Sequence, residues 1–190
     1  MRTSRRSVIA LIVGSALAAC AGSDETSLDD TSNTLPPVAE ASQDFNAADV
    51  MFAQQMIPHH SQAVEMASIA LEPGRASGAE VRDIAQRIQS AQDPEIEQMT
   101  EWLTSWSQPL DMAPMDGMDM DGMVASEDLD QLAELDGADF DAEWTRLMIA
   151  HHEGAIAMAK DEVDNGQNSD VIALAENIIT TQQAEIEEMR

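Results

Sequence analysis

Apolar and polar positions along this 190-residue chain repeat as two copies of one pattern. Residues 49–67 align without a gap with residues 141–159, at an offset of 92. A second pair of segments, residues 88–99 and 178–189, matches at an offset of 90. Within each segment the apolar residues recur every three or four positions, which is typical of an amphipathic helix. The repeat therefore predicts one helical unit that occurs twice.

Each copy is predicted to be a helical hairpin. Its two segments are joined by residues 73–78 in one copy and 165–169 in the other, and both loops are rich in residues that break helices. Short loops favour antiparallel neighbours, so two hairpins predict an all-α, antiparallel four-helix bundle. The domain is expected at residues 44–190, with copy one at 44–106, a methionine-rich linker at 107–128 and copy two at 129–190.

Two prolines interrupt the pattern of copy one. Pro58 and Pro94 each remove a helical hydrogen bond, which can kink a helix. Copy two has Ala150 and Ala184 at the matching positions, so helix is still predicted through both. Alternatively, Asp93 and Pro94 begin a new helix as its N-cap and first residue.

All four histidines of the chain lie in the matching segments, as His59-His60 and His151-His152. An α-helix turns about 100° per residue, so Met56 lies about 40° from His60 and one turn before it. Each histidine pair thus shares one broad helix face with an aspartate, an aromatic residue, an alanine and two methionines. These faces comprise Asp49, Phe52, Met56, His59, His60, Ala63 and Met66 in copy one, and Asp141, Trp144, Met148, His151, His152, Ala155 and Met158 in copy two.

The two faces carry the ligand types of a soft metal. Imidazole binds copper, zinc and nickel, whereas thioether selects Cu(I). A Met-His-His cluster without cysteine therefore predicts Cu(I), with Ag(I) as its surrogate, rather than zinc. Two alternative roles for these side chains stay open. The histidines could simply occupy polar helix faces, and Met66 and Met158 could fill gaps in the core.

Two further sets of polar residues are expected around the histidines. Asp49 and Asp141 precede them by two or three turns, and they either orient the rings or cap the helices. Glutamine and glutamate recur on the partner helices, where we expect buried polar residues that hydrogen-bond to the histidines. A di-iron bundle would need Glu-x-x-His on two helices, which this pattern does not match. The partner-helix residues are Gln92, Glu95, Gln182 and Glu185.

The linker between the copies is unusually rich in methionine. Its methionines alternate with Asp and Gly, a composition that predicts an irregular loop. Such a loop either docks on the bundle or captures Cu(I) through several weak thioether sites, with its carboxylates attracting the cation. The five methionines are Met112, Met115, Met118, Met120 and Met123.

The N-terminus is predicted to direct export. Arginines at positions 2, 5 and 6 precede an apolar stretch at residues 8–19 that has the length of a signal peptide. It ends in Leu17-Ala18-Ala19-Cys20, which resembles the lipobox of bacterial lipoproteins. We therefore expect a signal peptide at 1–19, lipidation of Cys20, and a disordered tether at 20–43 that lifts the domain from the membrane. We expect the lipid to anchor the protein to the outer face of the cytoplasmic membrane or to the outer membrane.

Charge limits the partners of this chain. Its formal net charge is −27, and removal of the three N-terminal arginines would bring it to about −30. Such a charge repels nucleic acid and attracts cations. Cys20 is the single cysteine, so no disulfide can form within the chain.

The duplicated Met-Ile-x-His-His-x-x-Ala-x-x-Met-Ala segments, with the Gln-x-x-Glu-Ile-x-x-Met partner segments, resemble the family named domain of unknown function 305. The resemblance covers residues 44–189. It implies a ferritin-like helical bundle, similar to the exported copper-binding proteins of CopM type that are implicated in copper resistance. It also implies metal ligands at Met56, His59, His60, Met66, Met148, His151, His152 and Met158.

Three hypotheses follow for the function. The leading one is a non-catalytic, extracytoplasmic protein that sequesters Cu(I) or transfers it, with a copper-handling protein or a second copy of this chain as its partner. The second is a metal-dependent redox or hydrolytic enzyme on a ferritin-like bundle, with Glu95 or Glu185 as its base. The third is a structural or partner-binding lipoprotein whose histidines sense pH.

Overall fold

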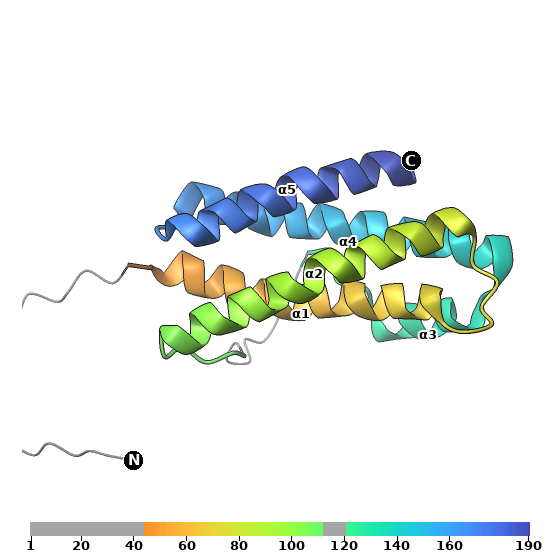
Figure 1. Ribbon diagram of the computed structural model, residues 1–190, viewed down its shortest axis with the longest axis horizontal. Coiled ribbons are helices and arrows are strands. Elements are labelled where there is room, and N and C mark those ends of the chain that lie inside the picture. The colour runs from red at the N-terminus through yellow and green to blue at the C-terminus, as the bar shows by residue number, and fades with distance from the viewer. Residues whose placement is uncertain (1–43, 112–120) are drawn as a thin grey trace, which may run out of the picture. The chain divides into compact units, whose positions relative to one another are not determined.

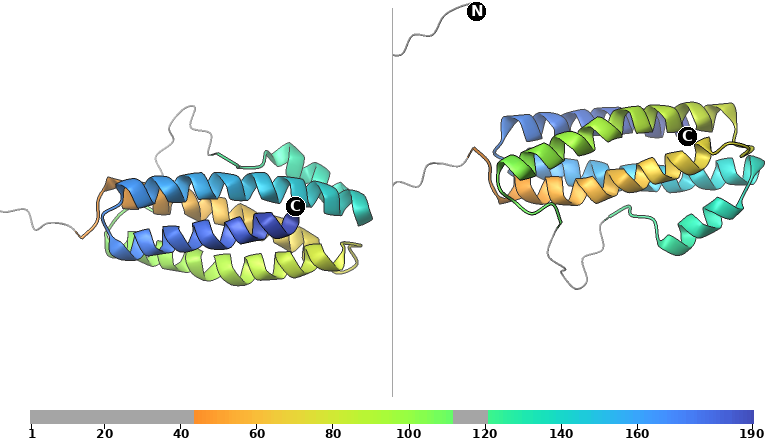
Figure 2. Two further views of the ribbon diagram at one scale, coloured as in Figure 1. Left: turned by 90° about the horizontal axis from the view of Figure 1, so that it is seen from above. Right: turned by 60° about the horizontal axis from the view of Figure 1, so that its bottom comes forward.

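A computed structural model describes residues 44–111 and 121–190 of the chain. Within these residues the chain forms helices and no strand, which confirms the all-α prediction. Figures 1 and 2 show the long helices alongside one another, with the short helix on their flank. The helices are α1 (Ala47–Leu71), α2 (Ala79–Ser105), α3 (Ser126–Glu134), α4 (Gly137–Asn165) and α5 (Ser169–Met189).

The two predicted hairpins are α1–α2 and α4–α5, and each is fastened to the loop of the other. The Asp49 carboxylate at the start of α1 accepts the backbone N–H groups of Gln167 and Asn168, at 3.1 and 2.9 Å. The Asp141 carboxylate near the start of α4 accepts the N–H of Gly78, at 2.9 Å. The start of each of these helices thus lies at the end of the other, so α1 and α4 run antiparallel.

The prolines do not interrupt the helices of copy one. α1 continues through Pro58 and α2 through Pro94, so no new helix starts at Asp93. Both prolines are exposed, which places the lost hydrogen bonds at positions that water can reach. Packing on both sides of each proline outweighs the local cost, since most helix stability in proteins comes from tertiary contacts.

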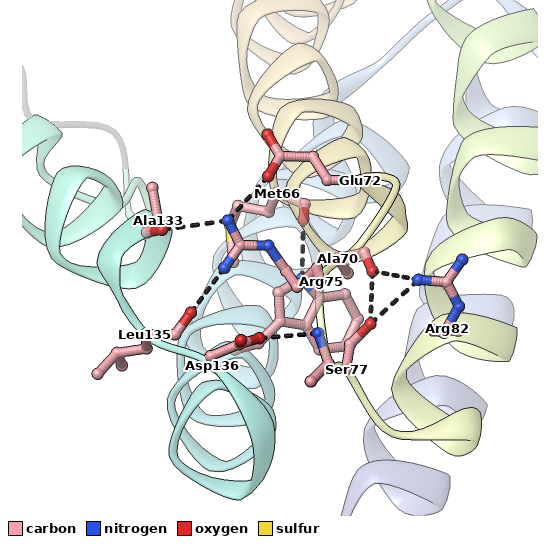
Figure 3. A network of polar contacts seen from close by, with 11 residues as sticks. Met66, Ala70, Glu72, Arg75, Ser77, Arg82, Ala133, Leu135 and Asp136 are labelled. Carbon is pink, nitrogen blue, oxygen red and sulfur yellow. Dashed lines mark hydrogen bonds and ion pairs between the residues drawn. The ribbon is translucent and has the colours of Figure 1, made fainter.

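The short helix α3 was not predicted, because it spans the expected boundary between linker and copy two at residue 128. It buries Leu132 against the bundle. Arg75, from the loop before α2, donates to the carbonyl oxygens of Leu135 and Ala133 at 2.6 and 3.1 Å (Figure 3). Its guanidinium lies 4.9 Å from the ring centroid of Phe140. This network ties α3 to the loop that joins α1 and α2.

The core is divided into two apolar clusters by a layer of buried polar side chains. The Trp144 cluster lies toward the end of α1 and the start of α4, and the Phe52 cluster lies toward the start of α1 and the end of α4. Each long helix contributes to both clusters and places its buried histidine or glutamine side chains between them. The Trp144 cluster includes Ala63, Met66, Ile84, Ile88, Phe140, Trp144 and Met148, the Phe52 cluster includes Phe52, Met56, Met99, Leu103, Ala155 and Ile178, and the layer comprises His59, His60, Gln92, His151, His152 and Gln182.

None of the described helices is both long and apolar enough to cross a membrane. The signal peptide, Cys20 and the tether lie outside the described residues.

Candidate metal centre

The centre of the layer is a contact between one histidine of each copy. His59 of α1 and His151 of α4 are fully buried, with ring centroids 3.8 Å apart and ring planes at 37°. The antiparallel arrangement of α1 and α4 brings them together, because each lies near the middle of its helix. His60 and His152 are fully buried beside them. The structure thus joins two histidine pairs that the sequence places 92 positions apart.

Several ring nitrogens in this layer have no hydrogen-bond partner. Among the described residues, no donor or acceptor reaches Nδ1 of any of the four histidines, or Nε2 of His151. A buried polar atom left unpaired costs about 1–3 kcal/mol. A bound cation that accepts these nitrogen lone pairs would remove that cost, so the layer has the chemistry of a metal site.

The outer histidine of each pair is held by a glutamate from the partner helix. His60 Nε2 lies 2.8 Å from the Glu95 carboxylate, and His152 Nε2 lies 2.7 Å from that of Glu185. The predicted contact of both glutamates with the histidines is therefore present. A carboxylate that accepts the Nε2 proton fixes the tautomer, so the lone pair sits on Nδ1. Nδ1 is the nitrogen that has no partner in both rings.

Burial keeps the inner histidines neutral. Desolvation, helped by the neighbouring His60, lowers the pKa of His59 to about 3, although the carbonyl of Asp121 opposes the shift. Desolvation and the nearby His59 also lower the pKa of His151 well below its ordinary value. A metal at these nitrogens would therefore not compete with protons at neutral pH.

Methionine side chains lie in the apolar clusters on both sides of the layer. Each apolar cluster contains the methionine that precedes the histidine pair in one copy and the methionine that follows the histidine pair in the other copy. Each also includes a methionine that was not predicted as a ligand, Met99 or Met189. The signal for these two was available, since each lies four residues after a histidine-bound glutamate. The sets are Met56, Met99 and Met158 at the Phe52 cluster, and Met66, Met148 and Met189 at the Trp144 cluster.

The last residues of the methionine-rich linker dock against the histidine layer. We call residues 121–124 the docked arm. The carbonyl of Asp121 lies 3.2 Å from His59 Nε2, and the backbone of Val124 exchanges two hydrogen bonds with the Gln62 side chain, at 2.8 and 2.9 Å. On the other side, a Cβ built on Gly154 would lie 2.0 Å from the Asp121 carbonyl oxygen, so only glycine fits. The arm therefore contacts one histidine of the central pair.

The remaining predicted residues are placed as follows. Asp49 and Asp141 do not orient the histidines, because their carboxylates accept loop amides at the ends of the bundle. Asp49 also completes a capping box with Asn46 at the start of α1, which is the alternative role predicted for it. Gln92 and Gln182 are buried in the layer, but their Oε1 atoms have no donor among the described residues.

Met123 lines a groove of about 690 Å³ along α1. Met112, Met115, Met118 and Met120 lie outside the described residues.

Comparison with known proteins identifies the family. A family model described as domain of unknown function (DUF305) matches residues 49–190. The chain belongs to the DUF305 family. This confirms the resemblance carried by the duplicated histidine segments, and the match spans both hairpins. No functionally curated protein matches the chain.

Solved DUF305 structures resemble this one. The chain is 35% identical to a DUF305 protein from Streptomyces coelicolor, covering 75% of this chain and 89% of that one, with a TM-score of 0.70. A DUF305 fragment from Deinococcus radiodurans is 33% identical over 76% and 93% of the two chains, with a TM-score of 0.68. CopM in its Cu(I)-bound form is 34% identical over 74% and 91%, with a TM-score of 0.61. CopM has also been solved in Cu(II)-bound and Ag-bound forms.

Proposed function

We propose that this DUF305 protein binds Cu(I) in the histidine layer and holds it for sequestration or transfer. The observation that carries the proposal is the set of unpartnered ring nitrogens on four fully buried histidines. The similarity to CopM, which was solved in Cu(I)-, Cu(II)- and Ag-bound forms, supports the same cargo here.

The proposed ligands combine imidazole with thioether. Nδ1 of each histidine offers a lone pair, and the methionines on either side offer sulfur, a combination that suits Cu(I) and Ag(I). Glu95 and Glu185 would hold the outer rings in place and balance the charge of the cation. We draw the ligand set from Met56, His59, His60, Met66, Met148, His151, His152 and Met158, and we add Met99 and Met189 because they lie in the same two clusters.

The same proposal places the protein outside the cytoplasm, attached through a lipid on Cys20. The signal-like residues 1–19 and the Leu-Ala-Ala-Cys sequence support it. The test is metabolic labelling with a fatty acid. We expect lipid on the wild-type chain and none on Cys20→Ser, together with release of that variant from the membrane fraction. Equal labelling of both chains would contradict the anchor.

The methionine-rich linker is proposed to collect Cu(I) for the histidine layer. The docked arm supports this role, because it joins the linker to His59. A variant with Met112, Met115, Met118 and Met120 replaced by leucine should take up Cu(I) more slowly, while the number of ions bound in the bundle stays unchanged. An unchanged uptake rate would contradict the role.

The histidine layer is tested by competition titration of the full chain with Cu(I) or Ag(I) against a chelator. Replacement of His59 and His151 together by glutamine should weaken binding by about 100-fold or more, since it removes two imidazole ligands. A matched control is Ser61→Ala with Glu153→Ala, which changes the exposed residue directly after each histidine pair. Unchanged affinity in a folded glutamine variant would refute the proposed site.

A further inference from the structure

A pocket of about 260 Å³ opens at one end of the bundle, between the start of α1 and the end of α4. Its lining includes two thioethers and two carboxyl groups, and it contains no basic side chain. The residues used below are Met51, Met158, Asp161 and Glu162. Asp161 is exposed at the pocket, where its charge attracts cations.

Glu162 is a buried acid without a donor. It is 1% exposed, and among the described residues no N–H or O–H group donates to either oxygen of its carboxyl. Its neighbour is Asp49, to which the protonated Glu162 carboxyl donates a hydrogen bond and whose carboxylate also accepts the amides of Gln167 and Asn168. A Cβ on Gly166 would lie 2.1 Å from Glu162 Oε1, so the loop leaves room for this carboxyl only because residue 166 is glycine. A buried carboxyl that lacks donors is costly unless a proton or another cation accompanies it.

Two methionines line the pocket that holds this carboxyl. Met51 is 45% exposed, although methionine usually fills gaps in a core. Met158 is partly buried and packs against the Phe52 cluster, which also contains Met56 and Met99. Thioethers therefore occur both at the surface and in the Phe52 cluster on one side of the histidine layer.

The pocket does not follow from the duplication. At the other end of the bundle, the positions that match Ala48, Phe52 and Gln55 hold larger apolar residues, all buried in the Trp144 cluster. The position that matches Glu162 is Ala70, and the position that matches Met51 is Glu143. The larger residues are Phe140, Trp144 and Leu147. One end of the duplicated fold is filled, whereas the other has an acid and an exposed thioether around an opening.

We propose that this pocket is a second, peripheral site that captures a soft monovalent cation between the carboxylate of Glu162 and the thioethers of Met51 and Met158. Its cargo, Cu(I) or Ag(I), rests on the proposed function, whereas its location rests on the pocket alone. Met158 then links the site to the buried thioethers beside the histidines.

The test is an Ag(I) titration of the full chain carrying ¹³C-labelled methionine methyl groups. We expect the resonances of Met51 and Met158 to shift on Ag(I) addition. Glu162→Gln and Met51→Leu should each raise the apparent Kd from these shifts at least tenfold. Asp164→Asn, which changes an exposed acid on the same helix outside the pocket, is the matched control and should leave it unchanged. Glu162→Gln keeps the shape of the side chain, so it tests the carboxylate rather than the packing.

The outcomes separate the two sites. Shifts at Met56 and Met148 without any at Met51 would overturn the peripheral site and leave the histidine layer intact. Shifts at Met51 that are equal in wild type and Glu162→Gln would also overturn it. Shifts at Met51 and Met158 that disappear in Glu162→Gln, while those at Met56 and Met148 persist, would establish it. A titration in which no methionine shifts would refute both sites.

Discussion

The two ends of the bundle are built from matching positions of the two copies, and yet they differ in packing. At the Trp144 cluster, the indole fills the core and donates to the carbonyl of Met66 at 2.9 Å, while Arg75 closes the surface over Phe140. At the Phe52 cluster, the matching phenyl ring lines a pocket whose wall includes the buried Glu162. The histidine layer between the ends is nearly symmetric. Duplication therefore preserved the central donors, whereas side-chain volume at each end decided whether the fold is closed or open.

The two copies also differ at the positions that face the docked arm. Gln62 in copy one exchanges hydrogen bonds with Val124, whereas Gly154 in copy two lets the backbone of Asp121 approach closely. As a result the arm reaches His59 but leaves Nε2 of His151 without a partner. The central histidines thus have related positions and different surroundings.

The largest expected effect compares the two aromatic residues. Trp144→Ala should lower the free energy of unfolding by about 4–5 kcal/mol, because it leaves a cavity in a filled cluster and removes a buried hydrogen bond. Phe52→Ala should cost about 3 kcal/mol, because the ring already borders an open pocket. Urea unfolding of both variants measures the difference. An equal or larger loss for Phe52→Ala would show that the two ends are packed alike.

The buried acid Glu162 should make the stability of the fold depend on pH, and the other end of the bundle has Ala70 at the matching position. Glu162 has its pKa raised from 4.5 to about 8 by burial and by Asp49. Between these values the folded chain keeps a proton that the unfolded chain has lost, so stability falls as pH rises through this window and is level above it. Glu162→Gln removes this loss and should stabilise the fold by about 3 kcal/mol at about pH 8, with little change at about pH 5.

Urea unfolding of this variant at both pH values provides the check, with Asp164→Asn as control. The histidines affect wild type and variant equally, so they cancel in the difference. A gain of the same size at both pH values would mean that Glu162 is ionised throughout.

A smaller effect is expected where the arm meets α4. Gly154→Ala should cost about 2 kcal/mol, because the new Cβ overlaps the backbone of Asp121 and the arm must move. Gln62→Ala, at the matching position, should cost about 1 kcal/mol through lost hydrogen bonds. Hydrogen exchange at the Val124 amide should accelerate in both variants. If the amide stays protected in Gly154→Ala, the arm does not depend on close approach to this glycine.

The smallest effect concerns the closed surface at the Trp144 cluster. Arg75→Lys keeps the charge but cannot reach the carbonyls of Ala133 and Leu135 together, so we expect a loss of about 1 kcal/mol. The loss should appear as faster exchange of amides in α3 rather than as weaker metal binding. Weaker Ag(I) binding in this variant would show that the two ends are coupled through the histidine layer.

Much of the fold could be predicted from the chain's own periodicity. The duplicated segments indicated two hairpins, and both are present. The contact of Glu95 and Glu185 with the histidines also followed, because they recur on the partner helices at one spacing. The helix α3 did not follow, since its nine residues carry a pattern too short to distinguish from the linker. Asp49 was ambiguous, because a carboxylate near a helix start can cap it or act at a distance.

The sequence by itself determined the helices, the duplication and the types of donor on each helix face, because these depend on local spacing. Tertiary structure alone decided which donors meet. The close contact of His59 with His151, the division of six methionines between two clusters, and the opening beside Glu162 depend on how the antiparallel hairpins pack. They depend also on the volumes of the side chains that face each other across the core, which cannot be deduced from the spacing of residues along a single helix.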